Sequence, residues 1–353
     1  MSLGSRLAAV GWTRRSSRRR RWLAAVAPAA LAAGCVSDLG TLGGNRSGGA
    51  GINEHGVTVG WSETGTGTVR AFRRPPGGPM IALEGTGATA AAVNDAGVVV
   101  GSATVDGGGG AAVIWDAEGT LHSLADLGLD LDPAVLVDIN DDGVAVGVRT
   151  APERVRAFLL DIDTATVEFL PFALHDNGAE DHQAHAINDA GAVVGEVCSE
   201  SRGCRAVLWR AGSHEPVLLG APEGWIAGVA VDVDDHGTVV GQIVDATRES
   251  TVLWRPGSYD DPALIEPPEG KLFTGRSIND RGQVVGTLVA PMGPGGLTAA
   301  VWDARTGAFT GLGGLGGRLS LPVDINDAGL AIGTASTPDG SADTHAVLYH
   351  TRR

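Results

Sequence analysis

Three aspartates recur at one position of a repeated phrase, directly before the Ile or Val that begins it: Asp138, Asp232 and Asp324. Carboxylate oxygens are the ligands that Ca²⁺ prefers, so three of them converging on one point would suit a divalent ion. The alternative is structural, because an aspartate beside a turn can accept hydrogen bonds from backbone N–H groups. The choice depends on whether the repeat brings the three copies together.

A second group of metal-type side chains lies between residues 171 and 185. Its members are His175, Asp181, His182 and His185. Imidazoles and carboxylates are suitable ligands for a divalent ion. The alternative is a polar loop, with His185 an ordinary strand residue. Apart from such an ion, the sequence predicts no cofactor.

A third group combines aromatic rings with a cation. Trp225, Phe273 and Arg276 lie in segments that are expected to be loops between the fourth strand of one repeat and the first strand of the next. Exposed aromatic rings beside an arginine can stack on a sugar or a peptide. The alternative is that these rings pack between neighbouring repeats.

Catalytic motifs are missing from the sequence. The chain has no G-x-S-x-G, no H-E-x-x-H and no phosphate-binding glycine loop. The segment Asp138–Gly143 matches the first half of an EF-hand loop, but Arg149 occupies the twelfth position, where that loop requires a glutamate. These observations favour a protein that is not an enzyme.

The element that must position these residues is an eleven-residue phrase that occurs seven times. Its copies begin at Ile52, Val93, Ile139, Ile187, Val233, Ile278 and Ile325. Each unit of 40 to 50 residues contains four short apolar runs, and a β-type repeat of this period predicts a propeller. Seven units of four strands predict an all-β, seven-bladed β-propeller with four-stranded antiparallel blades.

Each copy of the phrase contains two glycines. The first ends a turn that Asn or Asp opens, where a left-handed backbone is needed. These turn glycines are Gly56, Gly97, Gly143, Gly191, Gly237, Gly282 and Gly329. The second lies four residues later within a strand, which indicates a bulge or a close backbone approach. We expect crowding between neighbouring blades to be the cause.

The order of the apolar runs predicts how the ring closes. The chain begins with a run of the fourth type, Leu39–Leu42, and ends with a run of the third type, Ala346–Tyr349. Leu39–Leu42 is therefore expected to complete the last blade. Closure removes exposed strand edges, so deletion of residues 36–44 should destabilise the whole domain.

The first 34 residues have the pattern of an export signal. A basic stretch precedes thirteen mostly apolar residues, 22–34, which are too few to cross a bilayer but match a signal peptide. The segment Leu31–Cys35 resembles a bacterial lipobox. This resemblance implies cleavage before Cys35, a lipid on Cys35, and a propeller domain over residues 36–353 anchored to a membrane on its periplasmic or extracellular side. The alternative is an ordinary signal, and the arginines before Trp22 also fit a loose twin-arginine pattern.

The charge argues against one class of partner, and the two remaining cysteines suit an exported compartment. Residues 1–34 contain seven arginines and no acid, which leaves all 41 acidic residues in the remainder and a net charge there of about −22. Such a field repels phosphate backbones, so nucleic acid is not an expected partner. Cys198 and Cys204 flank a predicted hairpin turn, and we expect them to form a disulfide.

The repeated I-N-D-x-G-x-V-V-G phrase, the A-V-L-W runs and the segment Asp38–Gly44 resemble the bacterial HAF-repeat family of extracellular proteins. The resemblance covers nearly all of residues 37–350. The triplet that names the family is best matched by His345–Val347. Membership implies export and a propeller-like repeat, and it implies no particular activity.

Up-and-down connectivity places the variable loops on one face of such a propeller, and binding sites usually lie on such loops. We therefore expect a ligand site on that face, near the axis. The sequence predicts a non-enzymatic, lipid-anchored module that binds a glycan or a surface protein. The alternative is an exported glycan-active lyase or hydrolase. A polar cluster at the axis, made by several blades and with shifted carboxylate or histidine pKa values, would favour the enzyme.

Overall fold

The computed structural model describes residues 35–104, 110–151, 154–173, 180–199, 203–290, 296–338 and 343–351. They belong to one compact unit, Ala32–Arg353. These residues form 28 strands and no helix. Accordingly, the described part of the chain has no helix that could cross a membrane.

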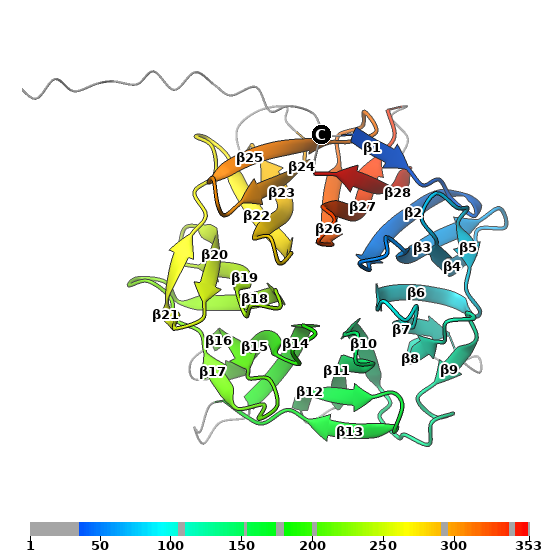
Figure 1. The fold of residues 1–353 in the computed structure, drawn as a ribbon, viewed down its shortest axis with the longest axis horizontal. Coiled ribbons are helices and arrows are strands. Elements are labelled where there is room, and N and C mark those ends of the chain that lie inside the picture. Colours follow the sequence, from blue (N-terminus) through cyan, green and yellow to red (C-terminus); the bar gives the residue numbers. More distant parts are fainter. Residues whose placement is uncertain are drawn as a thin grey trace, which may run out of the picture. The chain divides into compact units, whose positions relative to one another are not determined.

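The strands form seven four-stranded antiparallel sheets around a central axis, which confirms the predicted seven-bladed propeller (Figure 1). The innermost strands of blades 1 to 7 are β2 (Gly43–Ile52), β6 (Thr86–Val93), β10 (Ala134–Ile139), β14 (Glu180–Ile187), β18 (Ala227–Val233), β22 (Leu272–Ile278) and β26 (Ser320–Ile325). The second strands are β3 (Thr58–Thr64), β7 (Val99–Thr104), β11 (Val144–Ala151), β15 (Val193–Ser199), β19 (Val239–Val244), β23 (Gln283–Val289) and β27 (Leu330–Ser336).

The third and fourth strands complete each blade toward the outside. The third strands are β4 (Val69–Arg74), β8 (Gly110–Trp115), β12 (Arg154–Asp161), β16 (Gly203–Trp209), β20 (Glu249–Arg255), β24 (Thr298–Asp303) and β28 (Thr344–His350). The fourth strands of blades 1 to 6 are β5 (Ile81–Ala82), β9 (Leu121–Ser123), β13 (Thr166–Phe169), β17 (Pro216–Leu218), β21 (Ser258–Leu264) and β25 (Ala308–Gly313).

An N-terminal strand closes the ring, as predicted, but the strand is β1 (Cys35–Asp38) and not Leu39–Leu42. β1 pairs with β28, with Cys35 opposite His350 and Asp38 opposite Val347. The reason for the error is visible in other blades, where the fourth strand is followed by a buried residue such as Leu83 or Leu170. Leu39 is the equivalent residue: it is 9% exposed, and its N–H donates to Ala346. The strand therefore precedes this leucine.

The seven turn glycines all adopt the left-handed backbone, with φ between 70° and 83°. The second glycine of each phrase lies at a close backbone approach beside a bulge, as expected, but the approach is not between blades. In blade 4, a Cβ on Gly195 would collide with the backbone carbonyl of Gln183, which lies in the same blade beside the register shift between Ala184 and Ala186. The crowding thus arises within each blade, between a bulged first strand and the second strand, and not between blades.

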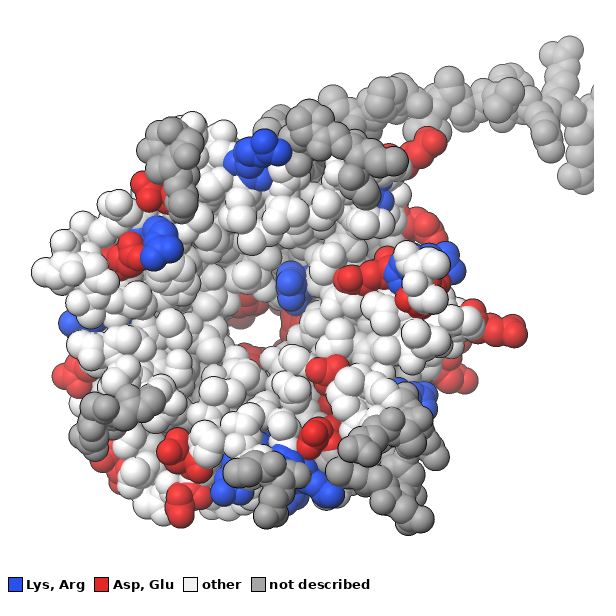
Figure 2. Space-filling model, turned by 180° about the vertical axis from the view of Figure 1, so that it is seen from behind, with Lys and Arg blue, Asp and Glu red and all other residues white. Residues whose placement is uncertain are grey.

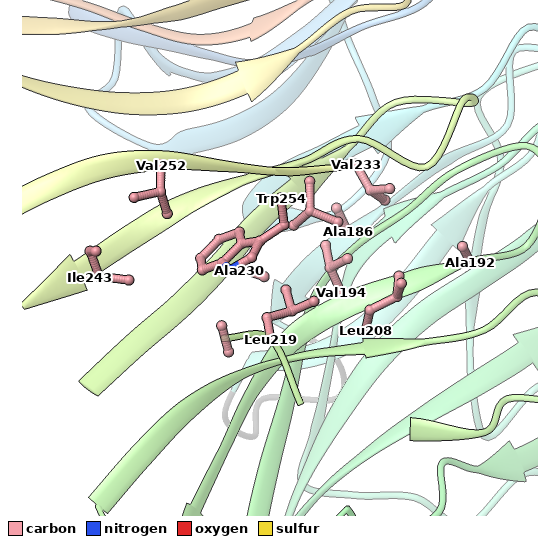
Figure 3. Close-up of a cluster of buried hydrophobic side chains, with 12 residues drawn as sticks. Ala186, Ala192, Val194, Leu208, Leu219, Ala230, Val233, Ile243, Val252 and Trp254 are labelled. Carbon is pink, nitrogen blue, oxygen red and sulfur yellow. The ribbon is translucent and has the colours of Figure 1, made fainter. Parts of the chain in front are cut away.

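The hydrophobic core lies between neighbouring blades. Figure 3 shows one such cluster, in which Trp254 of blade 5 lies against Val194 and Leu219 of blade 4. Trp254 is fully buried, and its indole N–H donates to the carbonyl of Gly220 at 2.7 Å. Each such ring contributes apolar burial and a specific hydrogen bond across a blade boundary.

The predicted disulfide is present. Cys198 on β15 lies directly opposite Cys204 on β16, and their sulfur atoms are bonded. The bond joins the two strands beside the loop that connects them.

Candidate functional site

Seven carboxylates surround one mouth of the central channel. In each blade an acidic residue follows the Asn or Asp that opens the turn, and we call this Asn or Asp the anchor. The acidic residue accepts a hydrogen bond from the backbone N–H of the equivalent acidic residue in the preceding blade, at 2.7 to 2.9 Å. The ring closes where Asp327 N–H donates to Glu54. Its members are Glu54, Asp95, Asp141, Asp189, Asp235, Asp280 and Asp327. We call this set the carboxylate ring.

A ring of amides lies beside the carboxylate ring. In six blades the anchor is an asparagine whose Nδ2 donates to the anchor carbonyl of the next blade, at 2.8 to 3.2 Å. Asn326 donates to Asn53 and so joins the last blade to the first. In blade 5 the anchor is Asp234, which has no amide to donate to Asn279. These two rings explain why the phrase is repeated so closely in every blade.

Asp138, Asp232 and Asp324 lie deeper in the channel and line one cavity of about 210 Å³. The structure therefore brings together the three aspartates that the sequence singled out. One oxygen of each accepts the N–H of the next residue, and the other accepts an N–H of the following blade: Ile187, Ile278 or Ile52. These bonds measure 2.8 to 2.9 Å, so each carboxylate ties two blades together.

Burial and mutual repulsion shift the titration of these three groups. Desolvation raises the pKa of Asp232 to about 7, with a further contribution from the charge of Asp324. Burial likewise raises the pKa of Asp138 well above its usual range and raises that of Asp324. The channel interior thus favours the protonated form of its carboxyls at pH values where an exposed aspartate is ionised.

The other end of the channel carries two nitrogen-bearing side chains. His185 and Arg276 line a cavity of about 130 Å³ that also reaches the three aspartates. Figure 2 shows this molecule with a central opening that has acidic atoms in its depth. His185 Nε2 is 3.9 Å from Glu196 and has no hydrogen-bond partner, and burial lowers its pKa while raising that of Glu196. His185, Arg276 and the three aspartates come from five different blades. Together they form the kind of polar cluster at the axis that would favour an enzyme.

The histidine group predicted to bind a metal is divided between two places. His185 faces the channel, whereas His182 is 1% exposed and packs edge-on against Phe172, with ring centroids 5.0 Å apart. Asp181 accepts the N–H of Val155 at 2.7 Å. His175 lies outside the described residues. His182 and His185 therefore do not converge on one ion.

The aromatic group is also divided. Phe273 is 5% exposed and packs against Phe309, so its ring belongs to the core and is not the exposed stacking platform that the sequence predicted. Trp225 is half-buried, with the guanidinium of Arg248 over its ring at 4.7 Å. Phe273 and Arg276 lie on the inner strand β22 and not in a loop, and the exposed side chain of Arg276 lines the channel.

The carboxylate ring was not recognised from the sequence as a channel feature. The signal was present, because an acid follows the anchor in all seven copies. A related group spans blades 5 and 6: Asp234 and His236 of blade 5 and Asp280 of blade 6 each bring one ligand-type atom within 4.8 Å of the others. Within one copy of the phrase, an acid after Asn or Asp indicates only a turn. The ring forms because all seven blades point these acids toward one axis.

No family model matches this chain, and no curated protein sequence matches it. Solved propellers are similar in fold. The propeller domain of the trilobed protease from Pyrococcus furiosus, which has an open velcro topology, gives a TM-score of 0.58 at 11% identity, covering 91% of this chain and 95% of that one. Oligogalacturonate lyase in complex with manganese gives 0.53 at 13% identity, covering 90% and 83%. A puromycin hydrolase gives 0.58 at 15% identity, covering 87% of this chain and 52% of that one. At these identities the likeness concerns the fold alone.

Proposed function

We propose that this chain is an exported, lipid-anchored and non-enzymatic propeller that acts as a binding or scaffolding module at the cell surface. The observation that most supports a non-enzymatic role is that both oxygens of Asp138, Asp232 and Asp324 accept backbone N–H groups. A general acid or base must reach a proton of the substrate. Carboxylates that join blades are positioned for stability rather than for proton transfer.

The anchoring part of the proposal is supported by the position of Cys35. This residue is exposed, has a free thiol, and is the first residue of β1. Cleavage before Cys35 would therefore keep every described strand of the propeller. A lipid on Cys35 would attach the outer strand of blade 7 to the membrane without a spacer.

The anchor is tested by cell fractionation of the full chain and of Cys35→Ser. We expect the wild-type protein in the membrane fraction, labelled by a fatty-acid analogue, and the variant unlabelled and released from the membrane. An unlabelled wild-type protein in the soluble exported fraction would contradict lipidation and leave an ordinary signal.

Binding is tested by thermal melting of the purified protein with a panel of glycans, surface proteins and divalent ions, with EDTA as a control. A ligand at about 100 times its Kd adds roughly 2.7 kcal/mol to the free energy of unfolding. We expect one ligand class to raise the melting temperature by a few degrees. A panel without any shift would contradict a binding role for the ligand classes tested.

A second candidate is an exported glycan-active lyase or hydrolase, and the axial cluster of Asp232, Asp324 and His185 favours it because the pKa values of all three are shifted. Turnover of a glycan in the panel, lost in Asp232→Asn and in His185→Gln, would establish the enzyme. Binding that persists in both variants without any product would establish the module.

A further inference from the structure

Three arginines lie together at the loop-face end of blade 3. Arg149 on β11 is directly opposite Arg156 on β12, and Arg154 is two residues from Arg156 on the same strand. Opposite residues of an antiparallel pair, and alternate residues of a strand, project from the same face. The three guanidinium groups therefore extend from one face of the blade.

These like charges are not compensated within the described residues. Arg46, Arg248 and Arg305 each pair with a carboxylate, whereas none of the three blade 3 arginines has a described carboxylate within ion-pair distance. Other arginines without an ion pair, such as Arg70 and Arg73, donate to backbone carbonyls, whereas the blade 3 arginines lie side by side. Burial and the charges of Arg154 and Arg149 lower the pKa of Arg156, which indicates unrelieved repulsion.

The same place contains buried donors that have no acceptor. Among the described residues, five buried side-chain polar atoms lack a hydrogen-bond partner, and three of these are Arg149 Nε, Arg156 Nε and His182 Nε2. His182 Nδ1 accepts the N–H of Ala157 at 3.3 Å, so its Nε2 carries the proton and is a donor. A buried donor without an acceptor destabilises the folded protein, and a bound anion would remove that penalty.

Aromatic rings give the cluster a fixed shape. The guanidinium of Arg156 lies 4.4 Å from the ring centre of Phe169, and that of Arg154 lies 4.8 Å from the ring centre of Phe172. Phe172 also contacts His182 edge-on. Stacking on a ring face holds a guanidinium in one orientation and leaves its N–H groups free to bind an acceptor.

We propose that Arg149, Arg154 and Arg156, with His182 Nε2 beside them, form a binding site for an oxyanion, namely a carboxylate or phosphate group of the protein's ligand. Arginine forks bind both groups through charge-assisted hydrogen bonds. The proposal rests on the proposed binding role and adds the chemical class of the ligand. The site lies on the variable-loop face but in blade 3, away from the axial carboxylates.

The test measures the melting temperature of the purified protein with inorganic phosphate, with sodium glucuronate, and with glucose, all against sodium chloride at matched ionic strength. We expect phosphate or glucuronate, and not glucose, to raise the melting temperature by a few degrees. A response to phosphate alone indicates a phosphorylated ligand, and a response to glucuronate alone indicates an acidic sugar. Either response supports the oxyanion site.

Variants locate the effect. Arg156→Gln and Arg149→Gln should each weaken the binding of the responding anion by at least about tenfold in calorimetric titration, because a charge-assisted donor is lost. Arg305→Gln is the matched control, since it removes the same charge from an exposed turn and should bind like the wild type. The melting temperature without anion verifies that each variant is folded.

The site is refuted if neither anion acts beyond sodium chloride, or if both glutamine variants bind as the wild type does. A different ligand that stabilises wild type and Arg156→Gln equally would refute this site and leave the binding role intact. His182 gives an independent readout by NMR. Burial and the neighbouring arginines lower its pKa to about 4, and a bound anion should raise that pKa.

Discussion

At the residue scale, Asp234 is the one anchor that cannot donate a side-chain hydrogen bond to the next blade. Six asparagine anchors do so, while Asp234 only accepts the N–H of Thr238 at 2.6 Å. Asp234→Asn would keep that acceptor and add a donor facing the carbonyl of Asn279. We expect an increase of about 1 kcal/mol in the free energy of unfolding, measured by thermal and denaturant unfolding.

The reverse change tests the same reasoning in another blade. Asn140→Asp removes the bond from Asn140 Nδ2 to the carbonyl of Asn188 and places a charge beside it. It should destabilise the protein by about 1–3 kcal/mol, because a buried carbonyl loses its donor. If Asp234→Asn destabilises and Asn140→Asp has no effect, the amide ring does not contribute to stability.

The axial aspartates predict the pH dependence of stability. Burial raises the pKa of Asp232 from 3.8 to about 7, so between these values the folded state binds a proton that the unfolded chain has released. The contribution of Asp232 to the free energy of unfolding therefore falls as pH rises from about 4 to 7 and is constant above that range.

The measurement is the melting temperature from pH 4.5 to 8 for wild type and Asp232→Asn. The variant should show a smaller loss of stability with rising pH, while Asp163→Asn, which changes an exposed residue, should keep the wild-type profile. His182 acts in the opposite direction below pH 6.5, because burial lowers its pKa to about 4. The comparison between variants is therefore the test, and identical profiles would contradict it.

At the element scale, β1 closes the ring, and the leucine that directly follows it is Leu39. Leu39 is buried in the cluster that joins blade 7 to blade 1, with Ile52, Phe72 and Ala346, whereas Leu42 packs on it from the side. Leu39→Ala should cost about 2–4 kcal/mol, and Leu42→Ala clearly less. Denaturant unfolding of both variants measures the difference, and a larger loss in Leu42→Ala would favour closure by Leu39–Leu42.

The elements themselves were predictable because each carries its own local signal. The period, the Val-rich runs and the turn glycines determine where strands begin and turn, and the fold follows from counting them. The register of β1 was not predictable in the same way. Leu39 and Leu42 both fit the apolar pattern of a short strand, and only the pairing of Asp38 with Val347 distinguishes them.

The candidate sites were predictable only in part, because they depend on distances around the ring. The repeat gives Asp138, Asp232 and Asp324 the same position in their blades, so the sequence indicated that they could converge, and the structure places them around one cavity. Whether Arg149 lies opposite Arg156 depends on the register of the hairpin. Whether a carboxylate lies near them depends on how all the surrounding side chains pack. Sequence spacing contains neither kind of information.

At the scale of the whole molecule, charge is distributed unevenly. The chain beyond residue 34 has a net charge of about −22, and seven carboxylates lie close together around one mouth of the channel. Exposed like charges repel one another, and salt screens this repulsion over a Debye length of about 8–10 Å near physiological ionic strength. Salt should therefore stabilise this propeller.

The melting temperature at pH 7.5 is expected to rise by a few degrees between about 10 mM and 300 mM sodium chloride, because the Debye length shortens over this range. Asp141→Asn should rise less, because the amide oxygen can still accept the N–H of Asp95 while one charge of the ring is gone. Arg156→Gln should keep the full rise, which separates screening of the carboxylate ring from chloride binding at the blade 3 arginines. A melting temperature that falls with salt would mean that attractive ion pairs outweigh this repulsion.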